Sequence, residues 1–367
     1  MTLSKSFLRG ACFSFFGLLL LAEILLRLTV PTGFWYRHFD FSGDMTSLAE
    51  LRDRIHYAVP GDHHILLLGD SVLGASSLIE HRIPGAKQKT LSFFLQGDIR
   101  EEDKKDPYAG PRQTLSVLSL GSDGLLLTDI QGLNAELPSS SPTKILLLLN
   151  FRMFSKDFAD GPKALSRHFL LTDLPEDIQK RLAPDKAPSA ETQLSDRVYA
   201  GMCDHWFLFR ETQMAKTLWY YPSQADFFQR RLEQVLPPNE TLAEITEASL
   251  KQKVAPYYQA YLWDPRALPL TCLKGILNQW AGRHLQVMVV LTPQNQKYLG
   301  SYLDKPSFEK NRKALAAFMK PYRKQGITYQ DWADRYPSSA FLDHCHLTPE
   351  GNQLYAKDLA IACIGWD

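Results

Sequence analysis

Five short apolar runs along the chain predict buried β-strands. Most of these runs show no alternation between apolar and polar residues, and longer helical or polar patterns separate them. Uninterrupted apolar runs of this length are typical of strands that are covered on both faces of a sheet. The predicted strands are His64–Leu68, Thr114–Leu120, Lys144–Leu149, Gln286–Leu291 and Ile327–Trp332. Strands that alternate with helices in this way predict an α/β fold built on a parallel sheet.

Three stretches have the apolar spacing of helices: Leu125–Leu133, Pro306–Gln325, and a last helix that runs from Pro349 to about Cys363. Thr348 is a good N-cap residue, because its hydroxyl can accept a hydrogen bond from a free backbone N–H of the first turn. Proline at the first helical position fits as well, since its missing N–H would have no partner there. The sequence therefore predicts a helix start at Thr348.

The segment between the first two strands gives no clear helical signal. Residues Val72–Gly85 carry mixed patterns, and Lys87–Pro111 are polar. The charge run Arg100–Lys105 is interpreted as part of a solvated surface loop. We therefore expect irregular structure over Lys87–Pro111.

A long segment separates the third strand from the fourth. Residues 151–283 are mostly helical in pattern, are rich in aromatic residues, and are broken by prolines. We interpret the segment as a helical insertion with aromatic core residues; the alternative for an exposed subset is a groove for sugar rings. The expected organisation is residues 1–30 as a cytoplasmic tip and anchor, 31–61 as a connector, and 62–367 as one domain that contains the insertion.

The amino terminus differs from the rest of the chain. Residues Gly10–Ala22 carry no charge, and with Glu23 and Arg27 the apolar segment reaches the ~20 residues that span a bilayer. A cleaved signal peptide is the alternative, but no small-residue cleavage site follows. We therefore predict one uncleaved transmembrane helix. Basic residues before it place the amino terminus in the cytoplasm and the remaining chain outside, on the periplasmic side. Glu23 and Arg27 are four apart on a helix and can pair.

Composition and charge exclude some functions. The formal net charge is +1, with 41 basic and 40 acidic residues. There is no basic stripe with interleaved aromatic residues, so we expect no nucleic-acid partner. Of the five cysteines, Cys203, Cys272, Cys345 and Cys363 follow the predicted membrane segment. In an extracytoplasmic domain they can form two disulfides, and free buried thiols are the alternative.

The first strand leads into a tripeptide that offers a nucleophile. Gly69, Asp70 and Ser71 follow the apolar run directly, and the glycine is interpreted as permitting a sharp bend where the strand stops. Ser71 then lies at the carboxyl end of a strand, where open α/β sheets place their ligands. A plain turn is the alternative for this tripeptide taken alone.

A loop near the end of the sequence offers a matching base and acid. His346 can take a proton from a serine hydroxyl, and Asp343, three residues earlier, can orient the imidazole. His344 is the rival base, but it is adjacent to Asp343 and points elsewhere in a regular turn. The histidine spacings lack the pattern of a closed zinc site, so neither a metal nor another cofactor is expected.

Two further residues can stabilise an oxyanion. Gly124 lies in a glycine-containing turn after the second strand, and Asn150 directly follows the third. The Gly124 backbone N–H, the Asn150 amide and the Ser71 backbone N–H are the candidate donors. Turn chemistry and capping are the alternative roles for Gly124 and Asn150.

The residues just described resemble the motif blocks of the SGNH (GDSL-type) hydrolase superfamily. Gly69-Asp70-Ser71 matches the first block, Gly124 the second, Asn150 the third and Asp343-x-x-His346 the last, over roughly residues 62–367. The third block departs from the family's usual Gly-x-Asn-Asp, because this chain has Leu148-Leu149-Asn150-Phe151. The resemblance implies a flavodoxin-like three-layer sheet, a catalytic Ser71–His346–Asp343 triad, and an oxyanion hole of Gly124 and Asn150.

A membrane anchor joined to such a domain resembles a narrower group of envelope proteins. These are the proteins of alginate O-acetylation and of teichoic-acid D-alanylation, which work beside a membrane-bound O-acyltransferase. This resemblance implies serine-dependent O-acylation of an extracytoplasmic glycan or cell-envelope polymer, at the cytoplasmic (inner) membrane. A carbohydrate esterase or lipase-like hydrolase, and an inactive envelope scaffold, are the alternatives.

Overall fold

The structure is a computed structural model that describes part of the chain. The described residues are 5–29, 64–75, 77–78, 81–105, 116–121, 125–135, 137, 144–154, 198, 206, 266–298 and 305–364. The chain forms two compact units, Met1–Asp40 with Lys186–Gln234, and Phe41–Asp185 with Val235–Asp367. Most of the predicted insertion, the connector and Gly124 lie outside the described residues.

The second unit is built on a five-stranded sheet in which all strand pairs are parallel. The strands are β1 (His64–Gly69), β2 (Ser116–Gly121), β3 (Lys144–Leu149), β4 (Gln286–Leu291) and β5 (Ile327–Asp331). Their order is β2-β1-β3-β4-β5, which is the flavodoxin-like order. The five predicted strands and the parallel α/β fold are confirmed.

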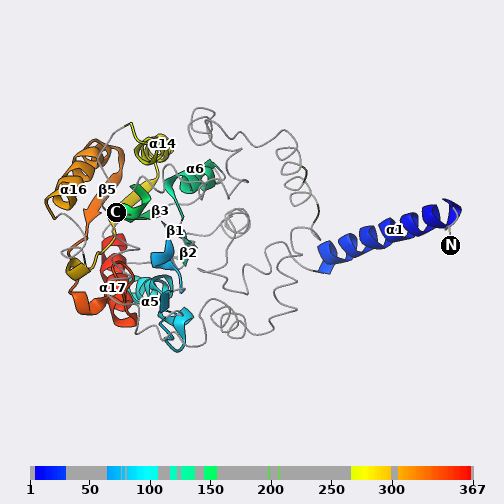
Figure 1. The fold of residues 1–367 in the computed structure, drawn as a ribbon, viewed down its shortest axis with the longest axis horizontal. Helices are drawn as coiled ribbons and strands as arrows, with labels where there is room; N and C mark the ends of the chain where they lie inside the picture. The colour runs from blue at the N-terminus through cyan, green and yellow to red at the C-terminus, as the bar shows by residue number, and fades with distance from the viewer. Residues whose placement is uncertain are drawn as a thin grey trace. The chain divides into compact units, whose positions relative to one another are not determined.

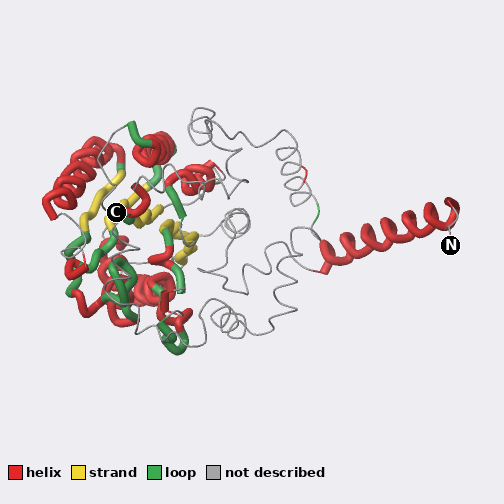
Figure 2. Tube along the Cα trace, in the orientation of Figure 1, coloured by secondary structure: helices red, strands yellow, loops and turns green. Residues whose placement is uncertain are grey.

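Helices cover both faces of the sheet and make three layers (Figures 1 and 2). They are α5 (Leu91–Lys105), α6 (Leu127–Ala135), α14 (Leu268–Gly282), α16 (Lys305–Met319) and α17 (Pro349–Ile364). Leu66, Leu68 and Leu147 point to the face covered by α6, α14 and α16. Ile65 and Leu67 point to the face covered by α5 and α17. Because successive strand residues face opposite sides, burial on both faces requires the continuous apolar runs seen in the sequence.

Short 3-10 helices connect several of these elements. They are η1 (Ser71–Leu73), η2 (Ala86–Lys89), η3 (Phe151–Phe154), η6 (Lys320–Gln325) and η7 (Ser338–Ala340). The predicted helix Pro306–Gln325 is α16 followed by η6, so its last six residues are not α-helical. Pro321 lacks an N–H and cannot continue the α-helical hydrogen bonds, which accounts for the change. Gly326, with φ of 81°, ends the segment.

Helix α5 corrects the prediction of irregular structure over Lys87–Pro111. Leu91, Leu95 and Ile99 are at most 1% exposed and recur every fourth residue, so they form the buried stripe of a helix. The Thr90 hydroxyl accepts a hydrogen bond from the backbone N–H of Phe93 at 3.3 Å and caps the first turn. The charge run Arg100–Lys105 belongs to this helix rather than to a loop. The many charges and Gly97 hide the helical pattern in the sequence, because only a narrow stripe of the helix is apolar. Packing of this stripe against α17 stabilises the helix.

Helix α17 begins where the sequence predicts. The Thr348 hydroxyl accepts a hydrogen bond from the Gly351 backbone N–H at 3.0 Å, so Thr348 is the N-cap. Gly351 approaches the preceding loop closely: a Cβ added there would lie 2.2 Å from the Ala340 carbonyl oxygen. The absence of a side chain therefore lets the helix pack against the loop that leads to His346.

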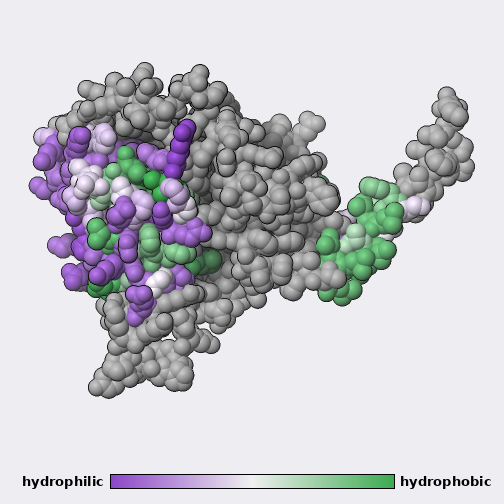
Figure 3. Space-filling view, turned by 90° about the horizontal axis from the view of Figure 1, so that it is seen from below, coloured by the Kyte–Doolittle hydropathy of each residue, from purple (hydrophilic) through white to green (hydrophobic). Residues whose placement is uncertain are grey.

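The described residues of the first unit are those of α1 (Lys5–Thr29), together with Val198 and Trp206. Large apolar side chains on the described part of α1 are exposed, among them Phe15, Phe16, Leu18 and Leu28 (Figure 3). Within the described residues, no helix reaches the length and hydropathy that crossing a membrane requires. The anchor stays a prediction. The predicted pairing inside α1 is confirmed, because Arg27 Nε donates to Glu23 Oε1 at 2.6 Å.

We expect Gly351→Ala to destabilise the fold. The added methyl group would overlap the Ala340 carbonyl, and overpacking of this kind costs about 1–3 kcal/mol. Thermal unfolding of the full chain, followed by circular dichroism, measures the effect. Gly97→Ala is the matched control, because a Cβ there meets nothing within 4 Å and alanine favours a helix by ~0.5–1 kcal/mol. Equal stability of Gly351→Ala and the parent would contradict the close approach.

Candidate active site

Ser71 lies just beyond the carboxyl end of β1. The Asp70 carboxylate accepts a hydrogen bond from the Val72 backbone N–H at 3.2 Å and caps η1, whose first residue is Ser71. Ser71 is 7% exposed. This is the edge of the sheet at which open parallel α/β folds bind their ligands.

Two glycines shape the turn that carries Ser71, for a reason the sequence did not reveal. A Cβ on Gly69 would lie 2.9 Å from Leu73 Cδ1, and one on Gly121 would lie 2.7 Å from Leu73 Cβ. Gly69 and Gly121 are register partners on β1 and β2. Among the described glycines only Gly85 and Gly326 have positive φ, so Gly69 provides space for Leu73 rather than an unusual backbone bend. The chain does bend at Asp70, where the strand stops, but the φ of Gly69 is not one that requires glycine, and the close contact with Leu73 is what a side chain there would disturb.

Asp343 and His346 come together within their own loop. One carboxylate oxygen of Asp343 accepts hydrogen bonds from the backbone N–H groups of Cys345 and His346, at 2.9 and 2.7 Å. The other oxygen lies 2.6 Å from His346 Nδ1. These three contacts fix the carboxylate against the loop, so the imidazole orientation follows from the loop conformation.

His346 also reaches Ser71. Its Nε2 lies 2.9 Å from the Ser71 hydroxyl oxygen, although the two residues are 275 positions apart. The structure thus brings Ser71, His346 and Asp343 together in a chain of two hydrogen bonds. In this geometry the serine proton can pass to the imidazole while the carboxylate holds the opposite ring nitrogen.

His344 points to a different neighbour. Its Nε2 lies 3.3 Å from Cys345 Sγ, and its Nδ1 lies 3.7 Å from Asp343 Oδ1. The histidine that contacts Ser71 is therefore His346, as the sequence analysis expects.

Asn150 lies at the same edge of the sheet as Ser71. β1 and β3 are parallel neighbours with Leu68 beside Leu147, and Ser71 and Asn150 both follow shortly after the carboxyl ends of these strands. Asn150 is 1% exposed, and its Oδ1 accepts a hydrogen bond from the Arg152 backbone N–H at 3.1 Å. Its Nδ2 has no hydrogen-bond partner among the described residues. An unpaired buried donor is costly, so this amide is suited to a ligand oxygen.

Arg152 is a residue of this site that the sequence analysis missed. Its Nη2 donates to Asp70 Oδ2 at 3.3 Å, and the Asp70 side chain is 1% exposed. The ion pair joins the turn after β1 to the turn after β3 and compensates a buried charge. The sequence does contain a signal for this ion pair, namely opposite charges just beyond the ends of β1 and β3. The pair can be predicted from it only when these two strands are known to be neighbours.

The pKa values of the acid and the base shift in opposite directions. Burial alone would raise the pKa of Asp343, but the charges of His346 and His344 and the hydrogen bonds from His346 lower it well below its usual range. Burial would lower the pKa of His346, but the charges of Asp343 and Cys345 raise it well above its ordinary value. The site therefore favours an ionised acid and stabilises a protonated imidazole.

Cys345 lies between the two imidazoles. Its Sγ is 3.3 Å from His344 Nε2 and 3.8 Å from His346 Nδ1. Burial would raise the pKa of this thiol, but the charges of His344 and His346 lower it to about 7. Cys272, Cys345 and Cys363 are buried and are not part of a disulfide, so of the two expectations for these three cysteines, buried thiols hold. Cys203 lies outside the described residues.

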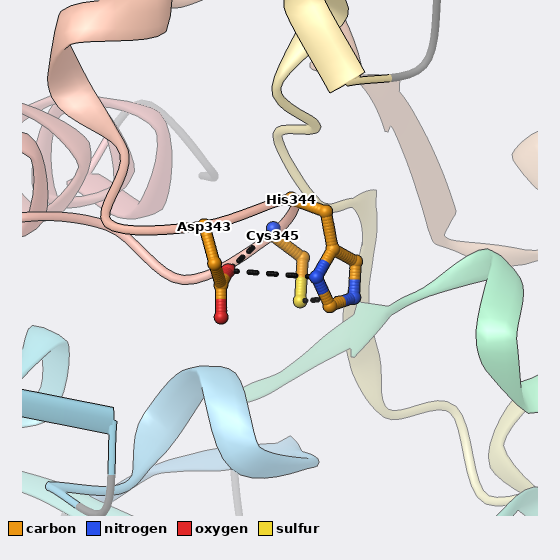
Figure 4. A group of neighbouring side chains, drawn as sticks. All are labelled: Asp343, His344 and Cys345. Carbon is orange, nitrogen blue, oxygen red and sulfur yellow. Dashed lines mark hydrogen bonds and ion pairs between the residues drawn. The ribbon is translucent and has the colours of Figure 1, made fainter. Parts of the chain in front are cut away.

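Asp343, His344 and Cys345 also have the residue types of a metal site (Figure 4). One ligand atom from each lies within 4.8 Å of the others. Both Asp343 carboxylate oxygens already contact N–H groups, however, namely two backbone amides and the His346 ring. A cation would have to compete with all three. The donor set therefore fits the orientation of His346 better than it fits a metal.

Comparison with known proteins gives no family for this chain. No protein-family model matches it, and no curated protein is significantly similar to it.

We expect the pKa of His346 to fall in Asp343→Asn. The carboxylate charge that raises the pKa is removed, whereas the burial that lowers it remains. Hydrogen–deuterium exchange at the imidazole C2 position, followed against pH by mass spectrometry of the peptide, measures this value in the full chain. Ser71→Ala is the control and should keep the raised pKa, because Asp343 stays in place. An unchanged pKa in Asp343→Asn would show that the carboxylate does not govern the imidazole.

Proposed function

We propose that the chain is an SGNH-type serine acyltransferase that O-acylates, and in particular acetylates, an extracytoplasmic glycan or cell-envelope polymer. The observation that carries the proposal is the pair of contacts at His346, to Ser71 at 2.9 Å and to Asp343 at 2.6 Å. The order of the motif residues along the chain and their place at the carboxyl edge of a parallel sheet support it further.

In the first half-reaction Ser71 takes the acyl group from a donor ester or thioester. The hydroxyl oxygen attacks the carbonyl carbon while its proton moves to His346 Nε2. Asp343 stabilises the imidazolium that forms. When the bond to the leaving group breaks, His346 returns the proton to that group, and an ester on Ser71 remains.

The negative oxygen of the tetrahedral intermediate needs donors that are already in place. The Asn150 Nδ2, which is buried and without a partner among the described residues, supplies one. The backbone N–H groups of Ser71 and Gly124 are the other donors we propose. One preorganised donor of this kind contributes about 3–4 kcal/mol to the reaction barrier.

In the second half-reaction an acceptor hydroxyl attacks the acyl-serine. His346 takes the hydroxyl proton, the bond to Ser71 breaks, and the proton returns to the serine oxygen. If water is the acceptor, the same chemistry makes the chain an esterase. Ser71 is 7% exposed, and the His346 side chain is 14% exposed. Limited access of water supports transfer to a bound hydroxyl, because a shielded ester survives until the acceptor arrives.

The class of acceptor follows from the resemblance to envelope O-acylation proteins and from the predicted anchor. The uncharged segment Gly10–Ala22 and the exposed apolar side chains of α1, such as Phe15 and Leu18, support insertion of this helix into the inner membrane. The domain then lies on the periplasmic side, where a membrane-bound O-acyltransferase can deliver the acyl group. The Leu148-Leu149-Asn150-Phe151 sequence departs from the SGNH pattern, but the Nδ2 of its asparagine is buried and has no hydrogen-bond partner within the described part of the chain.

We expect the full chain, given 4-nitrophenyl acetate, to form an acetyl ester on Ser71. The imidazole removes the serine proton, and the activated ester supplies a good leaving group. Mass spectrometry of the intact protein and of its peptides detects the adduct. Ser71→Ala should form none, and Asn150→Ala should form it about 10²–10³-fold more slowly. Oligosaccharide acceptors should then appear as acetyl esters in the parent reaction.

Two results would contradict parts of this proposal. Equal behaviour of the parent and Ser71→Ala would exclude the acyl-serine and leave an inactive scaffold. Release of free acetate alone, with every acceptor tested, would identify an esterase.

We expect alkaline phosphatase fused after Val30 to be active in cells, because the basic residues before α1 hold the amino terminus in the cytoplasm. Fusion of the same enzyme before residue 5 should be inactive, because that end stays in the reducing cytoplasm. Enzyme activity in whole cells measures the orientation. An inactive Val30 fusion would overturn the membrane topology.

A further inference from the structure

We propose that Asn295, which follows β4, is a positioning residue that holds the Asp343–His346 loop over Ser71. This inference rests on the proposed function, because it assigns the residue that sets the distance between base and nucleophile. Asn295 lies outside all four motif blocks.

Asn295 makes two hydrogen bonds to the loop, both to backbone carbonyls. Its side-chain Nδ2 donates to the Asp343 carbonyl oxygen at 3.0 Å, and its backbone N–H donates to the His344 carbonyl oxygen at 2.9 Å. The two carbonyls belong to successive residues directly before Cys345 and His346. They therefore fix the peptide from which the acid projects and the start of the turn that carries the base.

The amide orientation of Asn295 is determined by its surroundings. Its Oδ1 accepts a hydrogen bond from the Lys297 backbone N–H at 3.2 Å, so the Nδ2 must face Asp343. Asn295 is 2% exposed, and water does not compete for these bonds. Because both the Nδ2 and the Oδ1 of this buried side chain are hydrogen-bonded, the amide keeps a single orientation.

The segment around Asn295 is itself attached to the sheet. The Gln294 backbone N–H and the Gln296 side chain both donate to the Ala333 carbonyl oxygen, at 2.9 and 3.0 Å. Ala333 follows β5, the neighbour of β4. Asn295 therefore holds the loop in a fixed position relative to the edge of the sheet.

The strand order explains why such a tie is needed. β3 lies between β1, which leads to Ser71, and β4, which leads to Asn295. Neighbouring strands are about 4.8 Å apart, so the loop is fixed about two strand spacings from the serine and His346 must reach back across β3. Bonds within the loop, such as that from the Leu342 backbone N–H to the His346 carbonyl at 2.8 Å, shape it but do not set this span.

The inference is tested with the full chain in detergent and two readouts. The first is the rate at which a fluorophosphonate labels Ser71, which requires His346 in place but no acyl substrate. The second is the pKa of His346 from C2 hydrogen exchange, which requires no reaction at all. In Asn295→Ala we expect labelling to slow by about 10–100-fold, the scale of an ångström-sized displacement, and the His346 pKa to fall because Asp343 is less well held.

Gln296→Ala is the matched control, since it removes a side-chain-to-carbonyl bond of 3.0 Å from the same segment, while the backbone bond from Gln294 to the same Ala333 carbonyl keeps that segment attached to the sheet. It should leave both readouts close to those of the parent. Asn295→Asp keeps an acceptor for the Lys297 backbone N–H but removes the donor to Asp343, so it should slow labelling of Ser71 as Asn295→Ala does. It therefore tests the role of the donor even if the alanine variant folds poorly, and its added charge makes labelling rather than the His346 pKa its readout. Thermal unfolding of each variant reports stability separately.

Two outcomes would overturn the inference. One is parent-like labelling in both Asn295 variants together with a parent-like His346 pKa in Asn295→Ala, and the other is an equal effect of Gln296→Ala on both readouts. Absence of labelling in the parent contradicts the proposed function instead, and the His346 pKa series still decides the role of Asn295.

Discussion

The site depends on one hydrogen bond that joins groups 275 positions apart, between the Ser71 hydroxyl and His346 Nε2 at 2.9 Å. The parallel sheet makes this contact possible, because every strand delivers its carboxyl end to the same edge. β1 brings Ser71 there, β3 brings Asn150, and β4 brings Asn295. Helices on both faces bury the strands and hold these ends in register.

Because the polar side chains at this edge are buried, nearly all of their hydrogen-bond partners must come from the protein itself. The Asp343 carboxylate has no freedom left, since backbone amides hold one oxygen and the imidazole holds the other. Both carboxylate oxygens of Asp70 are also engaged: one accepts a hydrogen bond from the first turn of η1, and the other accepts one from Arg152. The Asn150 Nδ2, by contrast, has no hydrogen-bond partner among the described residues, and local rules fail most often at functional positions.

The sequence was informative where one element alone determines the pattern. Continuous apolar runs predicted the strands, and the Asp-x-x-His spacing predicted a local acid–base pair, because both follow from short-range geometry. Features that depend on a distant neighbour were missed. The stripe of α5 is recognisable only against α17, the role of Gly69 only against Leu73, and Arg152 only when β1 and β3 are known to be adjacent. Asn295 follows β4 as Asn150 follows β3, but its role can be inferred only from its hydrogen bonds to the loop of Asp343 and His346.

The separation of Ser71 and His346 along the chain has a consequence for biosynthesis. A growing polypeptide carries Ser71 and the strands β1 to β3 long before the ribosome has made His346. During that interval the serine lacks both the imidazole and the loop that Asn295 holds, so the hydrogen bond between Ser71 and His346 cannot yet form. The contact arises only when the last sheet strand and its following loop have been added, so its formation coincides with completion of the fold.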